Sequence, residues 1–412
     1  MTPHPVAVGN CAEEIYFGLL KARRERKKLA ILLPFELFRR GGPRTANGVV
    51  AAVGSEFRAV SPRSPAGLLG RAAITAYFGF FRVLGFLLRK LFRRELPAVY
   101  LHPALGTYTL WQPRDDMSFS WAVVDEYRWR EQLATPLPVW LDDADGQVAL
   151  GQLGALGLPG DAWWVCLHVR EGGFWGDQCV ERNADIANYI GAIEEITSRG
   201  GWVVRMGDST MKRLPPMERV IDYPFTGAKS PLMDVFLISG CRMYIGMSSG
   251  IYEIAILFQR PIILTNMWSW IFPYPQKPGD LSLLKHVYSR SRGRFLSLSE
   301  WLAEPFDSHF FYTVGEDYEY HENDSDELRA VVREFFERPD NWQPTELQRA
   351  FSEGRLVHGR RLLGQAEPII PNNDFADSHQ RYRLASRLES STGFLGSEFA
   401  RRNWERDARN PS

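Results

Sequence analysis

The chain has 412 residues, which is long enough for two domains, because a single hydrophobic core stops growing at about 250–300 residues. Apolar residues make up 45% of the chain and charged residues 24%, a composition typical of a folded protein rather than a disordered one. Forty-nine basic residues balance 49 acidic ones. This balance excludes a nucleic-acid-binding protein that depends on overall positive charge.

The cysteines and the N-terminus bear on the cellular compartment. The four cysteines show no CxxC spacing and stand mostly in apolar surroundings; they are Cys11, Cys166, Cys179 and Cys241. This pattern predicts reduced, buried thiols rather than a zinc site or a disulfide framework. The first residues lack the charged start, the apolar stretch and the cleavage site of a secretory signal. We therefore expect a cytoplasmic protein.

The first third of the chain alternates strand and helix. Short apolar runs at residues 5–8 and 29–33 indicate strands, and residues 13–27 between them show a helical pattern. Such alternation is typical of a parallel α/β layer. We expect residues 1–155 to form one α/β domain.

Residues 68–92 are the most apolar stretch. Arg71, Arg82 and Arg89 interrupt it, so its longest uncharged run is far shorter than the roughly 20 residues of a membrane-spanning helix. At about 100° per residue, these arginines fall on one narrow stripe of a helix. Two interpretations stay open. The helix is mostly buried with its arginines facing water, or residues 68–94 lie on a membrane surface and meet anionic head groups.

From residue 163 the alternation becomes regular. Strands are expected at residues 163–169, 202–206, 220–223, 243–246 and 261–264, and helices at residues 184–197, 231–239 and 252–258. Asn183 and Ser230 stand where helix caps belong, and Pro231 suits a first helical position. The series predicts a doubly wound, mostly parallel sheet within residues 156–300.

Residues 301–412 follow a different pattern. Their clearest periodicity is helical, at residues 326–338 and 347–363, and a polar tail follows. No internal repeat or low-complexity run occurs in the sequence. We expect a helical C-terminal extension.

Polar residues gather where the strands of the second domain end, which is the edge at which open α/β sheets bind ligands. Arg170 and Arg205 end neighbouring strands, and two guanidinium groups are suited to holding a diphosphate through bidentate hydrogen bonds. The predicted donor-binding set comprises His168, Arg170, Arg205, Gly207, Asp208, Lys229, Ser248, Ser249 and Gly250.

Several members of this set have distinct expected roles. Ser248, Ser249 and Gly250 precede a predicted helix, whose free N–H groups and dipole suit a phosphate oxygen. Asp208 would accept hydrogen bonds from a ribose or base, and Lys229 would close on the phosphates. Simpler explanations stay open, because a strand-end arginine is commonly half of an ion pair and a histidine in an apolar strand is commonly a core residue.

Other nucleotide-binding and hydrolytic motifs are missing from the sequence. No GxGxxG follows a predicted strand, and residues 227–230 lack the glycine that a P-loop requires before its lysine. There is no GxSxG elbow and no HExxH pair. The sequence therefore does not support a dehydrogenase, a P-loop kinase, or a motif-based hydrolase or metalloprotease.

Four segments resemble a family of bacterial glycosyltransferases of the GT-B type: GNCAEEIYFGLLKARRERKK, LHVREGGFWGD, RNADIANYIGAIEEITSRGGWVVRMGD and KSPLMDVFLISGCRMYIGMSSG. The resemblance covers most of residues 5–290. It implies two Rossmann-like doubly wound domains that face a cleft. Residues 1–155 would form the acceptor-side domain, residues 156–300 the nucleotide-sugar-binding domain, and residues 301–412 the helical extension.

A more distant resemblance concerns the tripeptide at residues 168–170. It is similar to the HxR motif of GT-B fucosyltransferases, whose arginine binds the donor diphosphate and helps the leaving group depart. The resemblance assigns that catalytic role to Arg170. The fucosyltransferase pattern continues with an acidic residue, a position that Glu171 or Asp177 would fill here.

The GT-B resemblance implies a reaction without a metal or a cofactor, because arginines, a lysine and a helix N-terminus can neutralise the leaving diphosphate. Glu13, in the first strand-to-helix turn, is the candidate catalytic base. The alternative is an acid that the helix dipole stabilises. The aromatic loop at residues 268–274 would either stack on a sugar or pack between elements.

The leading hypothesis is the transfer of a sugar from a nucleotide-sugar to a cell-surface glycan or a lipid-linked acceptor at the cytoplasmic face of the membrane. One alternative is a non-catalytic protein that binds a nucleotide-sugar or glycan. Another is a nucleotide-sugar epimerase of the same architecture.

Overall fold

The computed structural model describes residues 8–24, 26, 28–32, 46–50, 58–61, 63–94, 139–141, 143–173, 180–271, 275, 277–303, 317–363, 388 and 391–404. Within these residues the main element is a seven-stranded sheet in the order β12-β8-β7-β6-β3-β4-β5. Every neighbouring pair is parallel. The strands are β3 (Trp164–His168), β4 (Trp202–Arg205), β5 (Val220–Asp222), β6 (Met243–Gly246), β7 (Ile262–Met267), β8 (Leu281–Leu284) and β12 (Phe394–Leu395).

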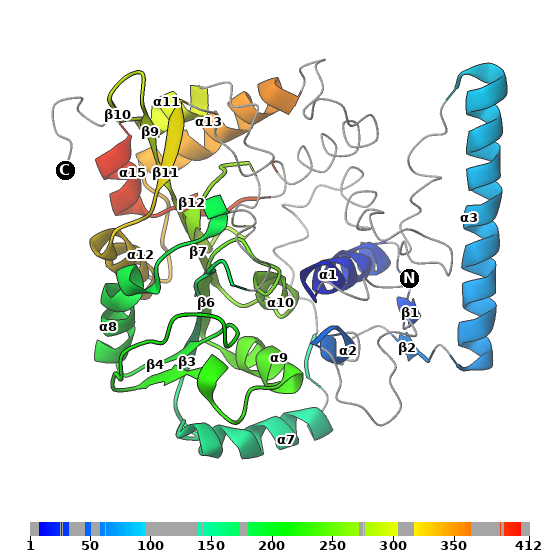
Figure 1. Cartoon of the computed structure of the whole chain (residues 1–412), viewed down its shortest axis with the longest axis horizontal. Coiled ribbons are helices and arrows are strands. Elements are labelled where there is room, and N and C mark those ends of the chain that lie inside the picture. Colours follow the sequence, from blue (N-terminus) through cyan, green and yellow to red (C-terminus); the bar gives the residue numbers. More distant parts are fainter. Residues whose placement is uncertain are drawn as a thin grey trace.

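Helices cover both faces of this sheet (Figure 1). On one face, α8 (Ile190–Ser198) packs against α12 (Ser325–Glu337). On the other face lie α9 (Pro231–Gly240) and α10 (Tyr252–Leu257). Because both faces are covered, the strands can be apolar along their whole length, and β6 and β7 are buried at every residue. The predicted doubly wound α/β sheet is confirmed.

Local signals explain where the helices begin. Ser230 caps α9 by accepting a hydrogen bond from the Met233 N–H, and Pro231 occupies the first helical position, as expected. The cap predicted at Asn183 is wrong. Asp185 is the cap instead, and it precedes a 3-10 turn, η4 (Ile186–Tyr189), which leads into α8. Two further 3-10 turns are η3 (Val180–Arg182) and η5 (Tyr223–Phe225).

The C-terminal part, predicted as a helical extension, contains short strands as well as helices. Its helices are α11 (Leu298–Ala303), α12, α13 (Glu346–Leu363) and α15 (Ser397–Asn403). β12 pairs with β8 and forms one edge of the main sheet. A second, antiparallel sheet has the order β10-β9-β11, with β9 (His286–Ser289), β10 (Arg294–Phe295) and β11 (Tyr318–His321).

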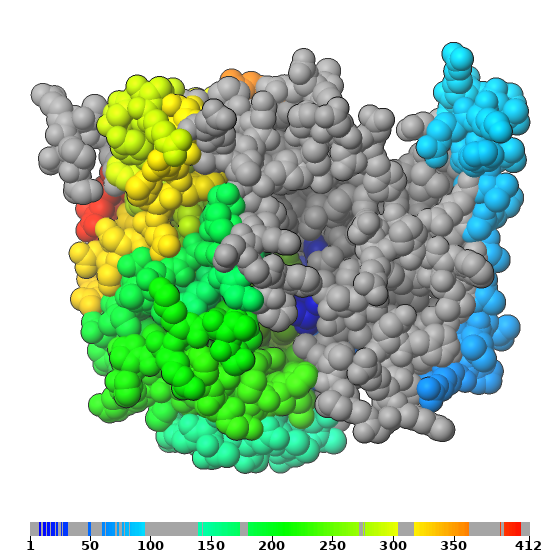
Figure 2. Space-filling model, in the orientation of Figure 1, coloured from blue at the N-terminus to red at the C-terminus, as the bar shows by residue number. Residues whose placement is uncertain are grey.

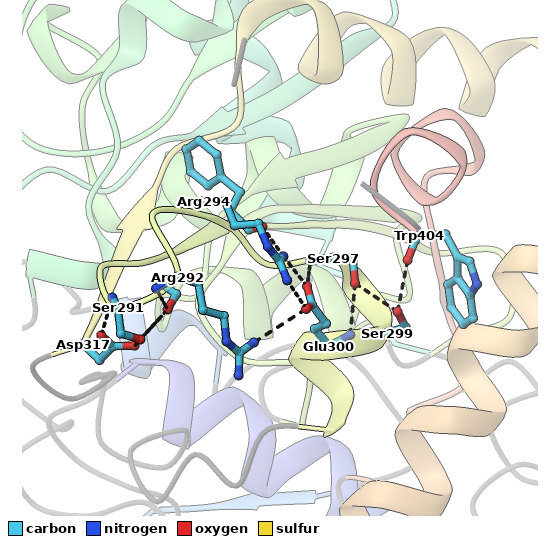
Figure 3. Close-up of polar contacts among 10 residues, drawn as sticks. Ser291, Arg292, Arg294, Ser297, Ser299, Glu300, Asp317 and Trp404 are labelled. Atoms are coloured by element: carbon cyan, nitrogen blue, oxygen red, sulfur yellow. Dashed lines mark hydrogen bonds and ion pairs between the residues drawn. The ribbon is translucent and has the colours of Figure 1, made fainter. Parts of the chain in front are cut away.

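The turn between β9 and β10 is tied to its neighbours by polar contacts (Figure 3). The Ser291 backbone N–H and hydroxyl both donate to Asp317, which lies just before β11. Arg294 forms a bidentate ion pair with Glu300 of α11 and, with the help of the Ser297 N–H, lowers the pKa of Glu300 to about 2. These contacts connect the second sheet to α11.

The N-terminal part packs directly on the sheet helices. α1 (Val8–Arg24) lies against α10, and α2 (Ala46–Val50) and α7 (Asp143–Leu153) lie against α9; α7 continues into the 3-10 turn η2 (Gly154–Leu156). β1 (Ala30–Leu32) and β2 (Arg58–Val60) form a parallel pair, as α/β alternation predicts. Val8, expected at the end of a strand, begins α1 instead, and residues 5–7 lie outside the described residues.

The contact between α1 and the sheet domain is close at Gly9. A Cβ atom at Gly9 would lie 2.5 Å from the Gly250 Cα. We expect Gly9→Ala to force α1 away from this turn and to lower the free energy of unfolding by about 1–3 kcal/mol, measured by urea denaturation. Gly227→Ala is the control, because a Cβ there has no heavy atom within 4 Å. Equal stability of the two variants would contradict this close contact.

The stretch at residues 68–92 forms most of one long helix, α3 (Pro65–Phe92), which stands at the edge of the molecule (Figure 1). The Ser64 hydroxyl caps its start, and Arg93 ends it in the left-handed conformation. Many of its large apolar side chains are exposed. This exposure corrects the interpretation of a mostly buried helix. None of the helices that the structure describes is long and apolar enough to cross a membrane.

Candidate functional site

Three neighbouring strands end together at one edge of the sheet. β3 ends at His168, and β4 ends at Arg205 on one side of it; on the other side, Gly246 ends β6 in register with His168. From β3 the chain runs outward to β4 and β5 and then returns to β6, so the strand order reverses between β3 and β6. In open α/β sheets, ligands bind at such a reversal, outside the carboxyl ends of the strands.

His168 is the buried centre of this edge. Its side chain is only 7% exposed, and its Nδ1 atom lies 3.3 Å from the Ser249 hydroxyl. Burial, together with nearby positive charge, lowers the pKa of His168 to about 4. The charged groups that act on it are Arg205, Arg170 and Lys229, which lower the pKa, and Asp208, which raises it. The imidazole is therefore neutral at pH 7, and the structure brings six members of the predicted set, Ser249 included, to one place.

Arg205 supplies a fully buried positive charge. Its Nη1 donates to Asp222 at 2.9 Å, and its Nη2 lies 3.8 Å from Glu171. Its Nε and Nη2 donate no hydrogen bond to any residue that the structure describes. Since the side chain has no exposed surface, this arrangement does not present the two-arginine fork expected from the sequence. In the structure Arg205 acts on its surroundings through its charge.

Arg170 is the partly exposed arginine of the site. Its Nη1 donates to the Asn183 Oδ1 at 2.7 Å, and its carbonyl accepts from the Ala184 N–H. Lys285, which follows β8 directly, donates to the Asn183 carbonyl at 2.7 Å and is 4% exposed. Burial lowers the pKa of Lys285 to about 8, against the opposing charges of Glu322 and Glu181. Asn183 thus connects Arg170 to a buried ammonium group.

The turn at residues 248–250 is held differently from the prediction. The Ser248 carbonyl accepts hydrogen bonds from the Arg182 guanidinium, including one from Nε at 3.1 Å. The helix that follows, α10, starts after Ile251, and neither serine caps it with its side chain. Ser249 contributes through its contact with His168.

The remaining predicted donor-binding residues lie at the same edge of the sheet, in the loops that follow β4 and β5. Gly207 has a φ of 144°, which favours glycine, and a Cβ there would collide with Met211. The Asp208 carboxylate accepts from the Thr210 backbone N–H at 2.8 Å. Lys229 forms an ion pair with Asp234 and is 30% exposed. Part of the hydrogen-bonding capacity of Asp208 and Lys229 is therefore used within the protein.

Arg182 and Lys285 were not anticipated from the sequence. A signal for Lys285 was present, because it follows the apolar run at residues 281–284, but that strand was not predicted. Arg182 belongs to a 3-10 turn far from any strand end in the sequence. Only the folded chain shows that it reaches across to Ser248.

Other predicted features have structural placements. Glu13 lies in α1, one turn after Gly9, and is 2% exposed. Trp268 and Trp270 are buried, which favours the packed-loop interpretation over a stacking surface; residues 272–274 lie outside the described residues. Three cysteines, Cys11, Cys166 and Cys241, are buried free thiols, as predicted, and Cys179 lies outside the described part of the chain. No cluster of three or more metal-ligating side chains occurs among the described residues.

The local chemistry of the edge suits an anionic ligand. The charges of Arg170, Lys229 and the buried Arg205 act on His168. Arg182 is connected to the same edge through the Ser248 carbonyl, and the buried Lys285 through Asn183. The neutral His168 can take part in hydrogen bonds without reducing this charge. Guanidinium and ammonium groups bind phosphate oxygens through charge-assisted hydrogen bonds.

The fold has remote similarities among solved structures. They include a family 9 glycosyl transferase from Veillonella parvula (11% identity, 61% of this chain and 77% of that one, TM-score 0.33). ADP-heptose lipopolysaccharide heptosyltransferase II from E. coli shows 13% identity over 64% of this chain and 83% of its own, with a TM-score of 0.34. The iron-containing dodecameric glycosyltransferase TibC from enterotoxigenic E. coli shows 13% identity over 88% and 73%, also with a TM-score of 0.34.

No protein-family model and no curated protein matches this sequence. The three similar structures are glycosyltransferases.

Proposed function

We propose that the protein is a glycosyltransferase that moves a sugar from a nucleotide-sugar donor to a glycan or lipid-linked acceptor. The observation that carries this proposal is the group of cations around a neutral histidine, at the reversal of strand order in a parallel sheet. Open α/β sheets bind nucleotides at this position. The diphosphate of a nucleotide-sugar has the negative charge that such cations would balance.

In the proposed reaction, the bond between the sugar C1 and the diphosphate oxygen breaks, and an acceptor oxygen forms the new bond to C1. Arg170 would stabilise the charge that develops on the leaving diphosphate, and Lys229 would assist it. The acceptor proton would pass to a base, for which we propose Glu13. The support for this role is that α1 contacts the turn at Gly250 through Gly9, one helical turn before Glu13. Neutralisation by arginine and lysine would serve in place of a metal ion.

The finer features of this proposal follow the sequence resemblance. The sugar would be a hexose or deoxyhexose, and the product a polysaccharide of the cell envelope. The protein would act in the cytoplasm, at the inner face of the membrane where lipid-linked acceptors are accessible. Residues 1–155 would form the acceptor side of a GT-B cleft, and residues 156–300 the donor side.

Donor binding is tested by thermal unfolding with a panel of nucleoside diphosphates and nucleotide-sugars. A ligand that binds only the folded state at about 100 times its Kd stabilises it by about 2.7 kcal/mol. We expect a base-selective rise in Tm that Arg170→Ala abolishes. Arg329→Ala is the matched control, because this arginine pairs with Glu194 on the α8–α12 face. A shift that survives in Arg170→Ala would remove Arg170 from the donor site, and no shift with any compound would contradict the proposal.

Transfer itself is measured as donor-dependent release of a nucleoside diphosphate in the presence of acceptor extracts. Glu13→Gln should keep the Tm shift and lose most of the release. Donor binding without turnover in every extract would favour a non-catalytic nucleotide-sugar-binding protein. Conversion of the donor without an acceptor would favour an epimerase.

A further inference from the structure

α3 presents an apolar surface to solvent. Its most exposed large side chains include Leu69 at 72%, Leu91 at 65% and Phe80 at 62%. With Val83 and Leu87, which are also exposed, they fall within about 80° of one another on a helix with 100° per residue. The half-buried side chains of α3 adjoin this face, centred about 90° from its middle; they are Phe81, Leu84 and Leu88. Exposure of such a continuous apolar face to water is unfavourable, so we expect an apolar partner to cover it.

The charges of α3 are of one sign. Residues 65–94 contain six basic residues and no acidic one. Arg71, Arg82 and Arg89 fall within about 20° of one another, on a stripe about 150° from the middle of the apolar face, and the exposed Leu68 and Phe86 lie between the two. Lys90, Arg93 and Arg94 add further charge at the C-terminal end, where the side chains of residues 89, 90, 93 and 94 are exposed. The partner of α3 should therefore be negatively charged as well as apolar.

The position of α3 leaves this face accessible. The helix has 28 residues, and at 1.5 Å per residue it is about 42 Å long. Figures 1 and 2 show it at the edge of the molecule, well away from the seven-stranded sheet. It is not apolar enough to span a bilayer. A helix of this kind binds in the plane of a membrane interface.

We infer that α3 docks on the surface of an anionic lipid bilayer, with its apolar face among the acyl chains and its basic stripe at the head groups. A bilayer interface offers both an apolar layer and negative charge along the whole length of the helix. A neutral protein groove would leave the six positive charges without a counterpart. The inference does not depend on the sugar-transfer activity, since it concerns only the surface of α3.

The test is sedimentation of the full chain with vesicles of phosphatidylglycerol and phosphatidylcholine, compared with vesicles of phosphatidylcholine alone. We expect binding to the anionic vesicles that weakens as salt increases. Phe80→Glu/Val83→Glu should reduce the partition coefficient at least about tenfold, and Arg89→Glu/Arg93→Glu should do the same for anionic vesicles only. The matched control is Val148→Glu/Leu150→Glu on α7, where both side chains are also exposed.

Two results would overturn the inference. One is wild-type protein that stays in the supernatant with both kinds of vesicle. The other is self-association of the wild type that the α3 variants abolish, without vesicle binding, which would make a second copy of the chain the partner. Thermal unfolding of each variant, with the Tm expected to match the wild type, separates lost docking from lost folding. The nucleotide panel is applied to the same variants, so failure here is distinguishable from failure of the donor-site proposal.

Discussion

Arg205→Met is expected to lower the free energy of unfolding by about 3–5 kcal/mol. The Arg205 side chain is completely buried, and its partners Asp222 and Glu171 are only 20% and 13% exposed. Methionine fills a similar volume but leaves two largely buried carboxylates without their cation. Urea denaturation at pH 7 measures the loss.

Two comparisons separate this effect from ordinary loss of an ion pair. Arg199→Met removes pairs with Glu195 and Glu337 from a surface arginine that is 30% exposed, so it should cost less than about 1 kcal/mol. Adding Asp222→Asn to Arg205→Met should recover part of the stability, because one uncompensated charge is removed. If Arg205→Met were as stable as Arg199→Met, the buried cluster would not contribute to stability as argued.

Acidification is expected to destabilise the protein through His168. Its pKa is about 4 in the folded state and 6.5 as the ordinary value, so the unfolded chain binds the proton first as the pH falls. The free energy of unfolding should therefore decrease from about pH 6.5 to about pH 4, with a contribution of about 2 kcal/mol between pH 7 and pH 5. His168→Asn, which keeps a polar group near Ser249, should lack this contribution.

The measurement is a series of urea denaturation curves from pH 7 to pH 4 for the wild type and the variant. His321→Asn is the control, because it removes a 47% exposed histidine from β11 of the second sheet, and the contribution of His168 should persist in this variant. Parallel pH profiles for wild type and His168→Asn would show that His168 is not held neutral by folding.

The sequence predicts most of the central sheet because its strands are continuous apolar runs. β6 is found at the predicted residues, and β3, β4 and β5 differ only at their ends. Signals that act over two to four residues, such as the Ser230 cap and the proline after it, are also confirmed. These features depend on neighbours in the sequence, so they can be recognised without the fold.

What the sequence misses depends on distant partners. β12 has two residues and is a strand only because it pairs with β8, more than one hundred residues earlier. Asn183 has the composition of a helix cap, yet its amide accepts from Arg170 and its carbonyl from Lys285. Because His168, Arg205 and Arg170 end or follow strands in the sequence, the prediction that they lie at one edge of the sheet is correct. The sequence did not show that the Arg205 side chain would be completely buried.

The short strand β12 also has a consequence for how this chain can fold. During synthesis, β8 leaves the ribosome long before residues 394–395. The outer backbone edge of β8 therefore stays unpaired until those residues have been made. Unpaired edges are where strands of other chains attach and aggregation begins. Contacts between such distant segments also slow folding, because a long loop has to close first. Pairing with β12 therefore protects the edge of β8 only late in synthesis. A nascent or truncated chain that lacks β12 should depend most on chaperones.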